Sequence, residues 1–153
     1  MRKKSPWLLM IILVLLAADQ LTKIAVRAFL EPEQSFRVLV FFSIVRIQNP
    51  GIAFGMLGNY GGLIIFISIM VVLILVVAIL ASRDDAQLFW PLALLIAGSS
   101  GNLIDRLVLK SVTDFIRFPR WPAFNLADIF VVVGVLLLIR VLLRRPRGAK
   151  AED

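Results

Sequence analysis

Four long apolar runs dominate this sequence, and each is long enough to cross a bilayer as a helix of about 20 residues. They cover residues of about 7–26, 62–81, 88–109 and 125–143. Hydrophobic residues make up 60% of the 153, well above the share usual for a soluble domain. We therefore expect one integral membrane domain over residues 1–153, of the membrane all-α class with four transmembrane helices.

Two longer connections, about 28–61 and 110–124, should lie together on one side of the membrane. Residues 36–47 are rich in β-branched and aromatic side chains with partial alternation, which predicts short strands between helices 1 and 2. The turn residues Asn49-Pro50-Gly51 end that stretch. Residues 54–60 are interpreted as a short helix in the interface. We expect a small extracytoplasmic β-strand segment beside the bundle.

The orientation follows from where basic residues cluster. Lysines and arginines are nearly balanced between the two sides, but Arg2-Lys3-Lys4 and the arginines at 144–147 lie directly against run ends. By the positive-inside rule this places both termini in the cytoplasm. The first run resembles a secretion signal, yet no A-x-A site follows and the helical pattern continues to Val26, so we expect it to be retained.

The amino-acid composition excludes several classes of catalytic and metal-binding site. The chain has no histidine and no cysteine, which excludes Ser-His triads, thiolate catalysis and most zinc sites. No metal and no cofactor is predicted. The net charge of +7 could indicate nucleic acid, but the basic residues lie beside apolar runs, as lipid headgroup anchors do. We therefore expect membrane lipid as a partner and no nucleic acid.

The acidic and amide residues concentrate at the outer boundary of the bundle. This layer contains Asp19, Asn49, Asn102, Asp105, Asp114, Asn125 and Asp128. Ionisable groups are costly in a membrane and usually mark a functional site. A transporter or channel subunit, one alternative, needs polar groups through the whole depth and often shows repeats. The inner half is nearly bare, so a site open to one side is favoured.

Two pairs of residues in or beside this layer also have purely structural interpretations. Asp19 and Lys23 are spaced i,i+4 and could form an ion pair that makes their burial tolerable. Asn102 and Asp105 share a helix face and could simply bond a neighbouring helix. Neither interpretation conflicts with a role in positioning a site.

Asp114 and Asp128 suggest a reaction. Two carboxylates within hydrogen-bonding distance share a proton, so one can activate water while the other polarises a carbonyl, as in aspartic proteases. The D-[TS]-G and GxGD motifs of other aspartic proteases are absent. Against catalysis, Asn125 and Asp128 have the spacing of a helix-capping box, which leaves a capping role open for Asp128.

A second alternative is a Ser-Lys peptidase. It would pair Lys110 with Ser99, Ser100 or Ser111. Lys110 lies at a wet boundary, where nothing desolvates its amine enough to make it a base. The aspartate pair is therefore the stronger hypothesis.

At these residues the chain resembles the lipoprotein signal peptidase family, also called signal peptidase II, over essentially its whole length. The matching segments are 19–23 (DQLTK), 49–54 (NPGIAF), 101–106 (GNLIDR), 112–115 (VTDF) and 124–128 (FNLAD). All five in order on one side are highly specific. One mild departure is Gly98-Ser99-Ser100-Gly101, where more glycine or alanine is expected; serine is still small enough for close helix packing.

The resemblance implies an aspartic endopeptidase of the bacterial inner membrane, with its site at the periplasmic face. Its substrates would be diacylglyceryl-modified prolipoproteins, cut just before the lipidated cysteine, and we expect a monomer. Asp114 and Asp128 match the catalytic pair. Matching the supporting or substrate-binding positions are Asp19, Lys23, Asn49, Gly51, Asn102, Asp105, Arg106 and Asn125.

Overall fold

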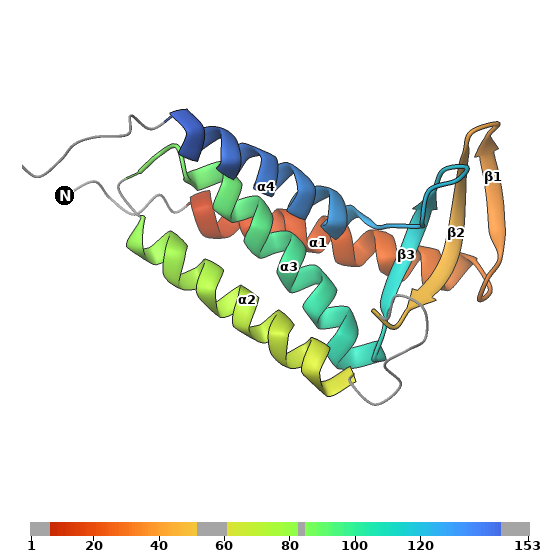
Figure 1. Cartoon of the computed structure of the whole chain (residues 1–153). Helices are drawn as coiled ribbons and strands as arrows, with labels where there is room; N and C mark the ends of the chain where they lie inside the picture. The colour runs from red at the N-terminus through yellow and green to blue at the C-terminus, as the bar shows by residue number, and fades with distance from the viewer. Residues whose placement is uncertain (1–6, 52–60, 83–84, 145–153) are drawn as a thin grey trace, which may run out of the picture.

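The computed structural model describes residues 7–51, 61–82 and 85–144 (Figure 1). In chain order the elements are α1 (Trp7–Phe29), β1 (Ser35–Leu39), β2 (Phe42–Asn49), α2 (Gly61–Ala81), α3 (Phe89–Leu109), β3 (Val112–Arg117) and α4 (Leu126–Arg144). The four helices run side by side, and the three strands form a sheet at one end of the bundle (Figure 1).

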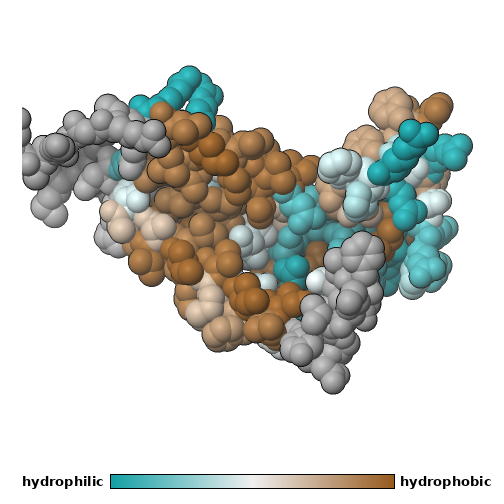
Figure 2. Space-filling model, viewed as in Figure 1, coloured by the Kyte–Doolittle hydropathy of each residue, from teal (hydrophilic) through white to brown (hydrophobic). Residues whose placement is uncertain are grey.

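The helices agree with the four predicted spans. Each is long and apolar enough to cross a membrane. Three of them begin and end within one residue of the prediction, whereas α1 continues to Phe29, beyond the predicted end near Val26. Apolar residues cover the visible sides of the helices, and hydrophilic ones concentrate toward the sheet (Figure 2). This distribution is the one expected for a bundle whose sides face lipid.

Helix α3 is the central helix of the bundle. Half of its most apolar stretch is buried, whereas the corresponding stretch of α2 is not buried at all. Its buried Leu92, Leu95 and Ile96 form a core cluster with Ile79 of α2. Small residues on α3 let α4 approach its backbone, as is common where helices pack in membranes. The polar residues of α3 are therefore held between neighbouring helices rather than exposed to lipid.

Gly98 provides a test of this packing. A Cβ at Gly98 would lie 2.5 Å from the carbonyl oxygen of Ala127 and 2.9 Å from Cγ2 of Val131, both on α4. We expect Gly98→Ala to lower the free energy of unfolding by roughly 1–3 kcal/mol, as overpacking does. The control is Gly62→Ala, where a Cβ would meet nothing within 4 Å. Thermal unfolding in detergent should leave the control unchanged or slightly more stable.

The sheet is antiparallel with the order β1-β2-β3. Strands β1 and β2 fall where strands were predicted, between helices 1 and 2. Strand β3 comes from the second connection, where the sequence analysis predicted no strand. Its pairing with β2 places Asp114 opposite Ile47. The sheet therefore joins the two connections, and β3 carries one member of the predicted aspartate pair. Residues 54–60, interpreted as an interfacial helix, lie outside the described residues.

Arg46 attaches this sheet to the bundle. It lies on β2, and its Nη1 donates hydrogen bonds to the backbone oxygens of Arg27, at 3.1 Å, and Leu30, at 2.8 Å. These carbonyls are at the end of α1, where a helix leaves its last oxygens without internal partners. The guanidinium therefore caps α1 and fixes the sheet over that end of the bundle.

Candidate active site

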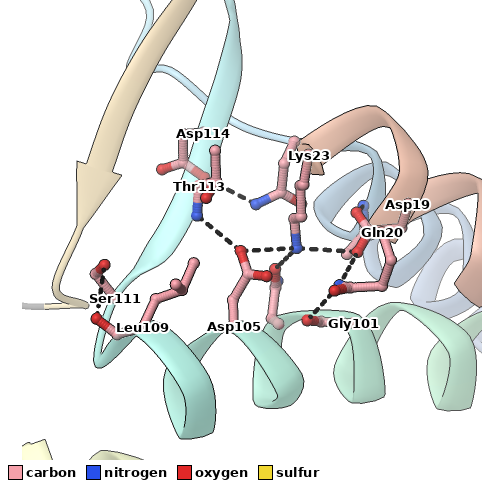
Figure 3. A network of polar contacts seen from close by, with 12 residues as sticks. Asp19, Gln20, Lys23, Gly101, Asp105, Leu109, Ser111, Thr113 and Asp114 are labelled. Atoms are coloured by element: carbon pink, nitrogen blue, oxygen red, sulfur yellow. Dashed lines mark hydrogen bonds and ion pairs between the residues drawn. The ribbon is translucent and has the colours of Figure 1, made fainter. Parts of the chain in front are cut away.

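The predicted polar layer forms one connected network between the helix ends and the sheet. Figure 3 shows the part of it around Asp19, Lys23 and Asp105. Asp114 is on β3, and Asp128 is in the first turn of α4. They are brought together because β3 leads through a short loop into α4. Each of their four carboxylate oxygens accepts one hydrogen bond from an amide of the chain.

Asp114 is buried, with 3% of its surface exposed. Its Oδ2 accepts a hydrogen bond from Nδ2 of Asn49 at 2.9 Å, and its Oδ1 accepts one from Nδ2 of Asn125 at 2.8 Å. Burial raises the pKa of Asp114 to about 6, against the lowering effect of these two bonds. The neighbouring charge of Asp128 raises the pKa further, and the more distant charge of Lys23 lowers it.

Asp128 has both cap contacts and a contact to another helix. Its Oδ2 accepts from the backbone N–H of Asn125 at 3.1 Å, and its own N–H donates to Oδ1 of Asn125 at 3.0 Å. This reciprocal pair is the predicted capping box. In addition, Nδ2 of Asn102 on α3 donates to Oδ1 of Asp128 at 2.8 Å. Capping alone needs no such contact, so the carboxylate is fixed from two elements.

Asn125 joins the two carboxylates. Its side-chain amide donates to Asp114, while its backbone N–H donates to Asp128. Asn125 is fully buried and is the residue directly before α4. One residue therefore sets the relative position of both aspartates.

Lys23 lies at the centre of a buried cluster formed by Asp19, Lys23, Asn102 and Asp105, which we call the Lys23 cluster. Its Nζ is 2.9 Å from Oδ2 of Asp19, 3.0 Å from Oδ1 of Asn102 and 3.5 Å from Oδ2 of Asp105. Lys23 and Asp19 are completely buried and Asp105 is 1% exposed. An ammonium has three donors, and here each has an oxygen partner. The predicted i,i+4 pair of Asp19 and Lys23 is confirmed.

The two acidic members of the Lys23 cluster also hold the segments that carry the aspartate pair. Asp19 accepts a hydrogen bond at 2.9 Å from the backbone N–H of Ala127, next to Asp128. Asp105 accepts one at 2.9 Å from the backbone N–H of Thr113, next to Asp114 (Figure 3). The cluster therefore fixes the backbone beside each member of the pair.

Two other predicted residues lie at the edge of the site. Gly51 has a φ of +78°, which favours glycine, and its N–H donates to Oδ1 of Asn49 at 2.9 Å. Arg106 is close enough to interact electrostatically with Asp128 and Asp114, and its buried Nε has no hydrogen-bond partner among the described residues. A Cβ at Gly51 would lie 3.7 Å from that Nε. Gly51 therefore lies directly beside this donor.

Two residues of the site, Arg27 and Thr113, were not predicted from the sequence. Nη1 of Arg27 donates to Oγ1 of Thr113 at 2.9 Å and lies 3.7 Å from Oδ1 of Asp105. A signal was present for Arg27, because it follows Lys23 by four residues and so shares its helix face. Thr113 gave no comparable signal, since its contact depends on the unpredicted strand β3.

An open pocket of about 290 Å³ adjoins the site on the side of α4. Its lining includes Asp128, with Trp121, Phe124, Ile129 and Val132 among its apolar residues. Asp128 thus lies at the edge of a space that suits an apolar ligand. No group of three or more acidic residues in the described ranges is placed to hold a metal ion.

Comparisons with known proteins identify the family. The family model described as signal peptidase (SPase) II matches residues 11–144. A lipoprotein signal peptidase from Moorella thermoacetica is 41% identical over 97% of this chain and 99% of its own length. One from Paraburkholderia phytofirmans is 40% identical over 95% and 89%.

Solved structures agree with this result. One bacterial membrane enzyme structure has a TM-score of 0.86 at 30% identity and covers 95% of this chain and 99% of its own. A second has a TM-score of 0.84 at 29% identity and covers 97% and 94%. The chain therefore belongs to the signal peptidase II family of membrane aspartic peptidases.

Proposed function

We propose that this chain removes the signal peptide from prolipoproteins whose cysteine carries a diacylglyceryl group, using water activated between Asp114 and Asp128. The observation that carries the proposal is the amide set around the two carboxylates. Every oxygen of the pair is oriented by one N–H donor, and Asn125 bonds both members. Such fixed geometry is what acid–base catalysis by a proton-sharing pair requires.

The two aspartates have different roles in this mechanism. Asp128 lies in the first turn of α4, where the helix dipole favours an anion. It accepts from Asn102, whose carbonyl oxygen in turn accepts from the Lys23 ammonium. Asp114 lies on a strand and accepts only from two neutral amides. We therefore assign the shared proton to Asp114 and the negative charge to Asp128.

The reaction then follows from these protonation states. Asp128 takes a proton from water as the water oxygen attacks the scissile carbonyl, and Asp114 donates its proton to the carbonyl oxygen. The tetrahedral intermediate collapses when Asp128 returns its proton to the leaving amine. Asp114 recovers its proton from the hydroxyl as the new carboxyl forms. No metal or cofactor takes part in these reaction steps.

The remaining residues position the pair or bind the substrate. The Lys23 cluster holds the backbone beside both aspartates, as described above. Nε of Arg106 is buried and has no hydrogen-bond partner among the described residues, so it can donate a hydrogen bond to a substrate carbonyl near the pair. The apolar pocket beside Asp128 can receive the hydrophobic part of the substrate as it approaches sideways from the bilayer.

Cleavage of a defined substrate tests this function. Purified protein in detergent should convert a diacylglyceryl-modified prolipoprotein into a free signal peptide and a product that begins with the lipidated cysteine. The same prolipoprotein without the lipid should remain uncut, because it lacks the group that the apolar pocket receives. Failure to cut the lipidated form under conditions where a characterised relative cuts it would refute the proposal.

The pH dependence tests the proton on Asp114. With a pKa of about 6, Asp114 holds its proton below that pH and loses it above. The rate constant kcat/KM should therefore fall above pH 6, by up to about tenfold per unit. Asn49→Ala removes a bond that lowers this pKa, so the fall should move to higher pH. A rate that rises from pH 5 to pH 7, or no shift in the variant, contradicts the assignment.

We further propose that the chain forms one membrane domain, acts as a monomer in the bacterial inner membrane and has its site on the periplasmic side. Reporter fusions test the topology. Fusions after Lys4, Asp85 and Lys150 should report a cytoplasmic position, and fusions after Gln34 and Arg120 an external one. An external C-terminus would place the aspartate pair on the opposite side.

The Ser-Lys alternative is disfavoured by contacts as well as by family. Nζ of Lys110 donates to the backbone oxygen of Leu107 at 3.3 Å, and Oγ of Ser111 donates to Oε1 of Gln48 at 2.8 Å. Lys110 is exposed, so its amine is not desolvated, and Ser111 is half-buried. The family comparison also disfavours a transporter or channel.

A further inference from the structure

Arginines line one face of the sheet, away from the aspartate pair. The strand register pairs Arg37 of β1 with Ser43 of β2, and Ser43 with Arg117 of β3. Paired residues project from the same face, and strands are about 4.8 Å apart, so the two arginines flank a small hydroxyl at about 10 Å. The adjacent row contains Phe36 and Ile44, which line an apolar pocket against α1 on the other face.

Arg120 adds a third guanidinium to this row. It follows β3 in a loop, with a φ of +65°. Within the described residues, the side chains of Arg37, Arg117 and Arg120 make no hydrogen bond or ion pair with the protein. Arg27 and Arg46, in contrast, are both bonded. Three neighbouring cations without internal partners make this part of the sheet a site for an anion.

The three arginines share a cavity of about 350 Å³. Its rim is apolar: Val40 is 90% exposed, Phe41 59% and Trp121 65%. Apolar atoms lie beside strongly hydrophilic ones at the tip of the sheet (Figure 2). Exposed aromatic residues next to arginines are typical of proteins at the membrane–water interface. A cavity open only to bulk water gives no reason for such a rim.

Trp121 also indicates where this cavity lies relative to the membrane. It lines the pocket beside Ile129 and Val132, with which the apolar surface of α4 begins. The arginine cavity and that pocket therefore share a wall at the boundary of the hydrocarbon. Phospholipid phosphates lie at this depth, and basic pockets there bind anionic headgroups.

We propose that Arg37, Arg117 and Arg120 bind the phosphate of an anionic phospholipid, which holds the sheet on the bilayer beside the mouth of the active site. The phosphate oxygens accept hydrogen bonds from guanidinium groups of the row, a geometry that arginine favours. Phe41 and Trp121 contact the glycerol and upper acyl region. The site is separate from the aspartate pair, so it does not depend on the proposed peptidase function.

Native mass spectrometry of the detergent-solubilised protein tests the site. The protein is mixed with equal amounts of phosphatidylglycerol and phosphatidylcholine of identical chains, and retained lipid is counted. We expect phosphatidylglycerol to be retained roughly a hundredfold more, because each of the three interfacial arginines contributes roughly a fivefold preference. The preference should fall to roughly fivefold in Arg37→Gln/Arg117→Gln, where only Arg120 remains, and should fall by roughly fivefold in Arg120→Gln. Lys110→Gln, a charge-matched change on the exposed end of α3, should retain it.

Any one of four results would overturn the proposal. Equal retention of both lipids would mean that the arginines do not select an anionic headgroup. An equal loss of preference in Lys110→Gln would mean that only general positive charge acts. Displacement of phosphatidylglycerol by millimolar inorganic phosphate would mean that the apolar rim contributes nothing and that the ligand is a free anion. Unchanged lipid retention in the double variant would mean that the arginine row does not bind the lipid. Because lipid retention is measured without turnover, none of these results bears on the peptidase function.

Discussion

Asp128→Asn is expected to abolish cleavage while leaving a folded protein. Asparagine retains the size of the side chain and can still accept from Asn102 or from the backbone N–H of Asn125, so the cap of α4 survives. It cannot take a proton from water. We expect turnover of lipidated prolipoprotein to fall by roughly 10³- to 10⁴-fold, with a change in unfolding free energy of at most about 1 kcal/mol.

Asp114→Asn should lose activity to a similar extent, and the double variant should be little worse than either single one, because residues that act as a unit are not additive. The matched control is Asp85→Asn, in the connection at the opposite end of the bundle from the sheet, which should cleave normally. If Asp128→Asn is folded and turns over at near the normal rate, Asp128 only caps α4 and the proposed mechanism is wrong.

The pH dependence of the unfolding free energy gives a further test of Asp114. The folded-state pKa of Asp114 is raised from 3.8 to about 6, so the folded chain binds more protons than the unfolded one between these values. Stability from this group is present at low pH and is lost as pH rises to about 6. Asp114→Asn keeps the site neutral and removes a cost of about 3 kcal/mol at pH 7.5. Its single amide oxygen can accept from only one of Asn49 and Asn125, so we expect a net stabilisation of at most about 2 kcal/mol. Loss of activity together with increased stability would show that the ionised Asp114 destabilises the fold and is retained for catalysis.

The sequence predicted those features that depend on local spacing and polarity. The four helices follow from apolar runs, and the Asp19–Lys23 pair follows from one helix turn. The common outer layer follows from the direction of each span. These inferences need no knowledge of which helices are neighbours.

Features that depend on long-range pairing could not be predicted in the same way. Strand β3 has six residues, and its buried pattern depends on pairing with β2, more than 60 residues earlier in the chain. The contact from Arg27 to Thr113 depends on that pairing. The spacing of Asn125 and Asp128 also left capping and catalysis as alternatives. In the structure the capping bonds and the bond from Asn102 occur together, so spacing alone could not separate them.

Lys23→Met is expected to destabilise the fold strongly. The Lys23 ammonium is the buried counter-charge of both Asp19 and Asp105, which are also buried. Removing one member of a buried ion pair leaves an uncompensated charge and typically costs about 3–5 kcal/mol. Methionine has a similar length, so the loss of charge rather than of volume should dominate. Equilibrium unfolding in a denaturing detergent would measure the change.

The control for this prediction is Lys110→Met, an equal change of charge on an exposed residue, which should alter the unfolding free energy by less than about 0.5 kcal/mol. Without Lys23, Asp105 keeps Arg27 at 3.7 Å, whereas Asp19 has no other ion-pair partner among the described residues. Adding Asp19→Asn to Lys23→Met removes that uncompensated carboxylate and should recover part of the loss, giving a coupling of at least about 1 kcal/mol in a double-mutant cycle. Activity should fall even in the surviving folded fraction, because Asn102 loses the partner that orients it toward Asp128. Additive effects of the two substitutions, or a Lys23→Met protein as stable as the wild type, would mean that the ion pair does not hold the site together.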